Sequence, residues 1–334
     1  MDVNIILSKF RTLERPESNA EAMPVLSIDG MQHKLNLSPD GFPRFFVSTS
    51  PESIGVNIVR EVLSVEYNTL CTVTGEGGIK EEAIYTMITL RSSEHSLQDY
   101  FIEIVLMLLE KLPATPTCHD LAIGMENLIS IFSALTLPPR KKIQGLWAEL
   151  LVIEQSAFPI TLINAWHVDP NAKYDFTLGR DKIEVKSTSS EKRQHHFSYE
   201  QLNPSLHSRL LVASTIVRES GDGENGYSVY DLYEKICSKL FVAEYRVKLY
   251  KVIAETVGKD VVKLKKIHYD YVQAADSLRF YDANKIPHIS EEGVPHYVSD
   301  VKFTSDLSDI DDIRIQEPKY NISGPLFKSL FKDC

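Results

Sequence analysis

The residues best suited to chemistry lie in the segment YDFTLGRDKIEVK, from Tyr174 to Lys186, which combines acids and a lysine at short spacing. Gly179-Arg180 is a suitable two-residue hairpin loop, because glycine readily adopts the positive φ of a type II′ turn. A hairpin closed there pairs Leu178 with Asp181, Thr177 with Lys182, Phe176 with Ile183 and Asp175 with Glu184. The register predicts one face with Asp175, Glu184 and Lys186, and another with Tyr174, Phe176, Ile183 and Val185.

Two carboxylates opposite each other, with Cβ atoms ~5 Å apart, destabilise a hairpin unless something offsets their repulsion. A divalent cation is a good candidate, because Mg²⁺ is commonly held by one or two carboxylates with phosphate and water. Lys186, on the same face, can stabilise negative charge on a phosphate or help to deprotonate a metal-bound water. The sequence therefore predicts a phosphodiesterase site. The alternative is a solvated face on which Lys182 and Lys186 only neutralise the acids.

Two further groups of side chains can complete such a site. Glu149 lies at the edge of the apolar stripe of a helix and can lean over the sheet toward the hairpin; the alternative is a solvated flank. Groups that can contact phosphate surround and follow the hairpin. They are Lys182, Thr188, Lys192, Arg193 and His196, with Gln201 in the next helix as a residue that can orient a ligand or the lysine. A charge run of this kind can also be a mobile loop.

The elements around these residues fall into three blocks. Residues 1–136 predict an antiparallel β-rich domain with strands at 33–37, 44–49, 65–73 and 84–90 and a helical connector at 98–112 and 119–135. Pro138-Pro139 cannot continue a helix and marks the boundary. Residues 137–220 form the predicted core, and residues 221–334 a helical and mixed region that packs on it.

The core predicts an α/β fold. Residues 143–157 have helical periodicity, with Leu146, Trp147, Leu150 and Ile153 on one stripe. Strand-like runs follow at 160–166, 174–178 and 182–187, then a short helix at 198–207 and a buried strand at 209–217. Residues 229–256 are expected to be helical, and the tail from about 278 mixes short strands and loops.

Composition limits the class of protein. The 334 residues carry 36 basic and 46 acidic side chains, a net charge of −10, which excludes a uniformly basic nucleic-acid coat. The acidity lies mainly in residues 1–136, at −9; residues 137–220 carry +2 and residues 221–334 carry −3. The most apolar run, 100–112, predicts a buried helix and not a membrane span. Widely spaced cysteines and the absence of a signal pattern in residues 1–16 predict a reduced, cytoplasmic protein that does not associate with membranes.

The pattern of residues 143–217 resembles the core of the PD-(D/E)XK nuclease superfamily, the restriction-endonuclease-like fold. More narrowly, GLWAELLVIE (145–154), YDF (174–176), IEVKST (183–188) and HHFSYEQL (195–202) resemble a bacterial PD-(D/E)XK family that often accompanies restriction or phage-defence genes. The resemblance implies that Asp175, Glu184 and the Val185 carbonyl ligate Mg²⁺, which Mn²⁺ can replace. It also implies that Lys186 is the catalytic lysine and Glu149 the helix carboxylate. Tyr174 stands where the motif has proline.

Two hypotheses follow. The first is a Mg²⁺-dependent DNA endonuclease, or the nuclease subunit of a restriction or phage-defence system. Such a protein would bind DNA and could assemble with other subunits of the system or with further copies of itself. The second is a non-catalytic interaction or DNA-binding subunit with a nuclease-like fold, which the acidic N-terminal block favours because such a surface suits protein contacts. The basic stretch 234–268, with interleaved tyrosines, fits either a nucleic-acid groove or a solvated face. A metal cluster of His288, Glu291, Glu292 and His296 is disfavoured, since its spacing has no helical register.

Overall fold

The computed structural model describes residues 3–17, 21–51, 55–167, 172–290, 293–315 and 323–331. The chain divides into two compact units. Unit 1 comprises Met1–Pro138 and Gly258–Val262, and unit 2 comprises Pro139–Val257 and Lys263–Cys334. The three-block division at 1–136, 137–220 and 221–334 stays a prediction. Glu291, Glu292 and Cys334 lie outside the described residues.

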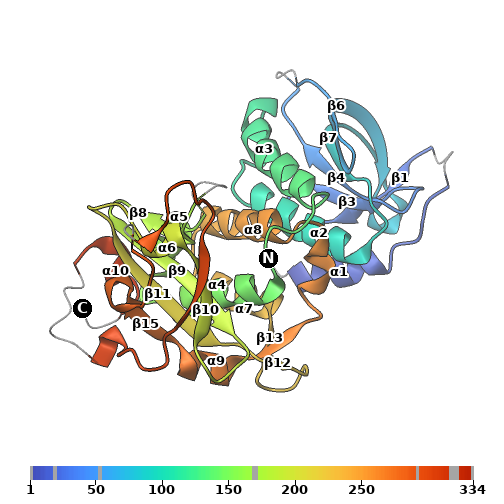
Figure 1. The fold of residues 1–334 in the computed structure, drawn as a ribbon. Coiled ribbons are helices and arrows are strands. Elements are labelled where there is room, and N and C mark those ends of the chain that lie inside the picture. The colour runs from blue at the N-terminus through green and yellow to red at the C-terminus, as the bar shows by residue number, and fades with distance from the viewer. Residues whose placement is uncertain are drawn as a thin grey trace. The chain divides into compact units, whose positions relative to one another are not determined.

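Unit 1 is built on a seven-stranded sheet in the order β1-β6-β7-β4-β3-β2, with β5 paired to β6. Its pairs are antiparallel except β1–β6, and the long hairpin β6–β7 dominates it (Figure 1). The strands are Met23–Pro24 (β1), Leu26–Ser27 (β2), Lys34–Leu37 (β3), Pro43–Ser48 (β4), Ile58–Val59 (β5), Leu63–Thr74 (β6) and Lys80–Leu90 (β7). This arrangement confirms the predicted β-rich N-terminal part.

The helices of unit 1 are α1 (Val3–Arg11), α2 (His95–Leu109) and α3 (Cys118–Ala134). The ring of Phe101 in α2 makes edge contacts with Phe45 of β4, at 5.7 Å between centroids, and with Phe132 of α3, at 5.8 Å. These rings join sheet and helices in one core. The apolar run 100–112 is therefore a buried helix, as predicted.

Unit 2 contains a four-stranded mixed sheet in the order β15-β11-β9-β8, seen in Figure 1. Its strands are Phe176–Leu178 (β8), Asp181–Thr188 (β9), Arg209–Ile216 (β11) and Arg279–Asp282 (β15). Strands β9 and β11 run parallel, and the other two pairs are antiparallel. Helix α4 (Ile143–Gln155) packs on β9 and on α7 (Val229–Cys237). The α/β class and the mixed sheet that carries the hairpin are confirmed.

The hairpin has the predicted register near its turn. Leu178, Thr177 and Phe176 pair with Asp181, Lys182 and Ile183, and Gly179 has a φ of 57°. The ladder ends at Phe176, so the predicted pair of Asp175 with Glu184 is not formed. The predicted face of Tyr174 is also wrong, because Tyr174 packs with Val212, the ladder partner of Glu184.

Two predicted elements of the core are wrong. Residues 160–166, expected as a strand, form helix α5 (Pro159–Ala165). Proline suits the first turn of a helix, and the buried Leu162 and Ile163 outweigh the β-branched composition of this run. The helix expected at 198–207 is only α6 (Tyr199–Leu202), because Pro204 disfavours helical backbone at Asn203.

The remaining elements of unit 2 are two small sheets and further helices. Strands β10 (Gln194–Ser198) and β16 (Lys302–Asp306) form an antiparallel pair. Strands β12 (Glu219–Ser220), β14 (His268–Asp270) and β13 (Gly226–Ser228) form a small sheet. The helical stretch predicted at 229–256 is divided into α7 and α8 (Ala243–Val257), and the other helices are α9 (Tyr271–Ser277) and α10 (Pro325–Lys328).

Two further sequence predictions concern membranes and cysteines. Among the described residues, no helix has both the length and the apolar character that crossing a bilayer requires. Cys71, Cys118 and Cys237 are buried.

Candidate active site

Three buried acidic side chains from separate elements of unit 2 line one cavity, together with the partly exposed Glu255. Glu149 lies in α4, Asp175 directly precedes β8, and Glu184 lies in the middle of β9. Their exposed fractions are only 2 %, 4 % and 4 %. Burial of a carboxylate is costly unless it is paired or hydrogen-bonded, so each of them needs partners.

The junction between α5 and β8 brings a histidine to this cavity. Trp166 forms a backbone bridge with Phe176, and the His167 amide donates to the Asp175 carbonyl over 3.0 Å. His167 has a φ of 41°, in the left-handed region that side chains other than glycine adopt rarely. The backbone therefore holds His167 beside Asp175.

Glu149 accepts hydrogen bonds at both of its carboxylate oxygens. Its Oε2 atom contacts Trp166 Nε1 at 2.7 Å and His167 Nε2 at 2.8 Å. Its Oε1 atom accepts from Lys141 Nζ at 2.7 Å. Helix α4 therefore presents Glu149 in one fixed orientation, with Oε1 toward Lys141.

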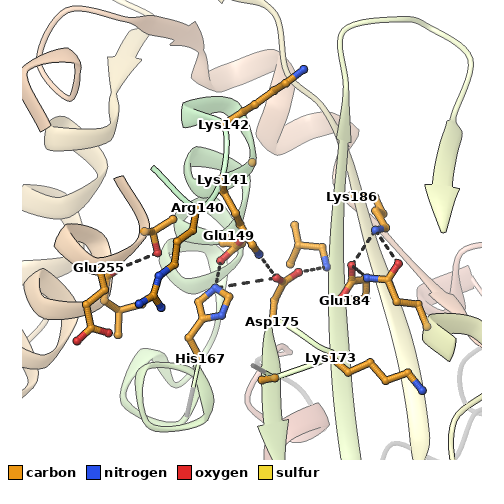
Figure 2. A pocket seen from close by; sticks show the side chains of 16 residues that line it. Arg140, Lys141, Lys142, Glu149, His167, Lys173, Asp175, Glu184, Lys186 and Glu255 are labelled. Carbon is orange, nitrogen blue, oxygen red and sulfur yellow. Dashed lines mark hydrogen bonds and ion pairs between the residues drawn. The ribbon is translucent and has the colours of Figure 1, made fainter. Parts of the chain in front are cut away.

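Asp175 lies between Glu149 and His167 on one side and Glu184 on the other (Figure 2). Its Oδ2 atom accepts from the backbone amide of Val185 at 2.7 Å. Its Oδ1 atom contacts Lys141 Nζ and lies 4.0 Å from His167 Nε2. One ammonium group thus touches Glu149 Oε1 and Asp175 Oδ1 together.

The second half of the site is a triangle of Glu184, Lys186 and Gln201; Glu184 and Lys186 lie on the right of Figure 2. Glu184 Oε1 is 2.7 Å from Lys186 Nζ and accepts from Gln201 Nε2 at 2.6 Å. Lys186 Nζ also donates to Gln201 Oε1 at 3.2 Å. Gln201 is held by reciprocal hydrogen bonds with Ser198 at the start of α6. A capped helix turn therefore fixes the lysine and the glutamate.

The carboxyl groups differ in acidity. Burial and the neighbouring Asp175 raise the pKa of Glu184 to about 8. Burial and the Glu149 charge raise the pKa of Asp175. Burial also opposes ionisation of Glu149, but the His167 hydrogen bond and the Lys141 charge outweigh it and lower the pKa of Glu149 to about 2. Close like charges and low solvent access thus give the three carboxyl groups different pKa values, and such differences are typical of functional sites.

Basic side chains surround the acids. The cavity has a volume of about 520 Å³. Besides the acids, its lining includes Arg140, Lys141, Lys142, Lys173 and Lys186. Arg140, Lys142 and Lys173 are exposed. The site thus combines a buried acidic centre with a basic rim, which suits a phosphate-containing ligand.

Most of the predicted core residues meet in this cavity: Glu149, Asp175, Glu184, Val185, Lys186 and Gln201. In the described chain, Lys182, Thr188, Lys192, Arg193 and His196 are not among its lining residues. Lys182 Nζ donates to the Gly179 carbonyl, and His196 Nδ1 contacts Thr304 Oγ1. The Arg193 guanidinium donates to Ser214 and to the Ser277 carbonyl.

Three residues of the cluster escaped the sequence analysis: Lys141, Trp166 and His167. Lys141 belongs to the basic run after Pro138-Pro139, which indicated only a boundary. Trp166 and His167 follow a segment expected to be a strand, so no pattern directed them toward Asp175. A correct helix at 159–165 would have placed a turn next to the hairpin.

Comparison with known proteins gives a family match. A family model described as "Putative PD-(D/E)XK family member, (DUF4420)" matches residues 6–308. No curated protein matches the chain, and no solved structure does.

Proposed function

Because this chain belongs to that PD-(D/E)XK family, we propose that it is a Mg²⁺-dependent DNA endonuclease, or the nuclease subunit of a restriction or phage-defence system. The observation that supports this proposal is the convergence of Glu149, Asp175, Glu184 and Lys186 in one basic-rimmed cavity. PD-(D/E)XK nucleases generally use divalent metals.

The donor set fits a divalent cation. Glu149 Oε1 and Asp175 Oδ1 already converge on the Lys141 ammonium, a positive charge in contact with both oxygens. Asp175 and Glu184 would hold the ion, with the Val185 carbonyl and Glu149 as further ligands. When bound, such an ion lowers the pKa of water and stabilises the leaving 3′ oxygen of a phosphodiester.

The side chains around the ligands have positioning roles. The Val185 amide orients Asp175, and Trp166 and His167 orient Glu149. Lys186, which contacts Glu184 and Gln201, would stabilise negative charge on the scissile phosphate. Cleavage then leaves 5′-phosphate and 3′-hydroxyl ends, as the family resemblance implies.

The DNA backbone would contact the basic rim. Arg140, Lys142 and Lys173 line the cavity and are exposed, so they can reach phosphates. We retain as phosphate contacts Gln201, which lines the cavity, and, outside the cavity lining, Lys182, Thr188, Lys192, Arg193 and His196. Both terminal nitrogens of Arg193 already donate to groups of the fold.

A cleavage assay tests the proposal. Purified protein should nick or cut DNA with Mg²⁺ or Mn²⁺ and not with EDTA. Asp175→Asn and Lys186→Ala should each abolish cleavage with the far-UV spectrum unchanged. Glu191→Gln is the control, because Glu191 is exposed and lies outside the cavity. Cleavage that survives both substitutions would refute the assigned site.

One observation favours the non-catalytic alternative. Lys141 neutralises Glu149 and Asp175 within the chain itself, as a structural ion pair would. Calorimetry distinguishes the two functions. A nuclease site should bind Mg²⁺ or Mn²⁺ with an affinity that depends on Asp175 and Glu184, whereas a structural subunit should show no such binding.

A further inference from the structure

We propose that His167 Nε2 is a metal ligand, so that Glu149, His167 and Asp175 bind a divalent transition-metal ion such as Mn²⁺ in preference to Mg²⁺. The inference deepens the proposed function and rests on it for the presence of a metal site. It differs from the family motif, whose ligands in this chain are all oxygens.

The first argument is the distance between the donor atoms. One ligand atom from each of Glu149, His167 and Asp175 lies within 4.8 Å of the other two. His167 Nε2 is 2.8 Å from Glu149 Oε2 and 4.0 Å from Asp175 Oδ1. Atoms this close can share one ion after small side-chain rotations, since metal–ligand bonds are ~2.0–2.2 Å long.

The second argument is the way the backbone places the ring. The Trp166–Phe176 bridge and the bond from the His167 amide to the Asp175 carbonyl fix two successive residues against the start of β8. The left-handed φ of His167 costs free energy, and such outliers concentrate at functional sites. His167 is 20 % exposed and lies 5.6 Å from the Trp166 ring, so the imidazole is held inside the cavity.

The third argument is that hydrogen bonds from the fold hold one oxygen of each carboxylate, which leaves the other oxygen directed toward a cation. The Val185 amide occupies Asp175 Oδ2, and Trp166 Nε1 donates to Glu149 Oε2. Hydrogen-bonded carboxylates of this kind are typical of metal ligands, because outer partners orient the coordinating atom. Asp175 Oδ1 and Glu149 Oε1 face the same ammonium, Lys141 Nζ, and would face an ion that replaced it.

The nitrogen donor determines the class of ion. Mg²⁺ prefers oxygen ligands in near-ideal octahedral geometry and gives up its water reluctantly. Transition-metal ions accept imidazole more readily, and their selection in proteins depends on ligand type. A site that adds one imidazole to these carboxylates should therefore discriminate against Mg²⁺.

Pulsed electron paramagnetic resonance of the Mn²⁺-loaded protein provides the direct test. A coordinated imidazole should give ¹⁴N modulation in the wild-type echo, and His167→Gln should abolish it. The glutamine amide still donates a hydrogen bond to Glu149, so this variant separates coordination from positioning. His196→Gln, on the exposed part of β10, is the control and should retain the modulation.

Calorimetry provides the second readout. We expect Mn²⁺ to bind at least about tenfold more tightly than Mg²⁺, and His167→Gln to weaken Mn²⁺ about tenfold or more while changing Mg²⁺ less than about threefold. Mn²⁺ binding without ¹⁴N modulation, or equal weakening of both metals, would overturn the inference and leave the nuclease proposal intact. If neither metal binds the wild type, both fail.

Discussion

Glu184→Gln should stabilise the metal-free protein while removing a proposed metal ligand. Burial and Asp175 raise the pKa of Glu184 from an ordinary 4.5 to about 8. The folded chain therefore keeps a proton that the unfolded chain releases above pH 4.5. The stability that depends on this group is complete below pH 4.5 and is lost as the pH rises through about 8. A glutamine amide has no proton to lose, and its oxygen still accepts from Lys186 and Gln201.

The size of the effect follows from the pKa. Stability changes by at most about 1.4 kcal/mol per pH unit for one such group. Between pH 4.5 and pH 7 this gives an upper limit of about 3 kcal/mol in favour of the variant. Addition of Mn²⁺ or Mg²⁺ should then stabilise the wild type more than the variant, because ligand binding favours the folded state only where the ligands are present.

Urea denaturation in EDTA between pH 5 and pH 8 measures the effect. The matched control is Glu154→Gln, also at a buried glutamate of unit 2, where hydrogen bonds from Lys239 and Tyr271 outweigh burial and lower the pKa of Glu154. That variant should be less stable than the wild type, because it leaves a lysine without its counter-ion. If Glu184→Gln also destabilises the metal-free protein at pH 7, the reasoning that burial and the Asp175 charge make an ionised Glu184 unfavourable is refuted.

Three further predictions concern the surroundings of the site. Lys141→Met should lower the stability of the metal-free protein by about 3 kcal/mol, because it leaves Glu149 and Asp175 without the lysine that contacts both. It should also raise the Mn²⁺ affinity at least about tenfold, because the ion no longer competes with that lysine for the two oxygens; weaker binding in calorimetry would contradict this. Trp166→Phe should remove the hydrogen bond to Glu149 and weaken Mn²⁺ about tenfold, with Glu191→Gln unchanged. Burial lowers the pKa of His195 to about 4, so stability falls as the pH drops from 6.5 toward 4. His195→Gln should lack about 2.5 kcal/mol of that loss in urea titrations at pH 7 and pH 4.5; an identical loss in both proteins would exclude His195 as its source.

The sequence predicted those parts of the site that depend on local chemistry. The Gly179-Arg180 turn fixes three cross-strand pairs, and helical periodicity places Glu149 on the inner edge of α4. The family motif lies on these same elements, so the fold class and the acids could be expected together. The lysine two residues after Glu184 follows from the same register.

The remaining parts depend on contacts between distant segments. Lys141 reaches Asp175 across 34 positions, and Trp166 reaches Glu149 across 17. Residues 160–166 have a β-type composition, yet packing of Leu162 and Ile163 makes them a helix. Local propensity is a weak prior where tertiary packing decides, which explains why the histidine of the cluster was missed.

The hydrogen bond between the Val185 amide and Asp175 makes the site accessible to hydrogen-exchange measurements. This amide is protected by a side-chain carboxylate in place of a strand partner, because the β8 ladder ends at Phe176. Its exchange with deuterated solvent therefore reports the position of one carboxylate, whereas the amides of the ladder itself report opening of the sheet. A single resonance or peptide can thus follow rearrangement of the site in any variant, including those that neither cleave DNA nor bind an ion.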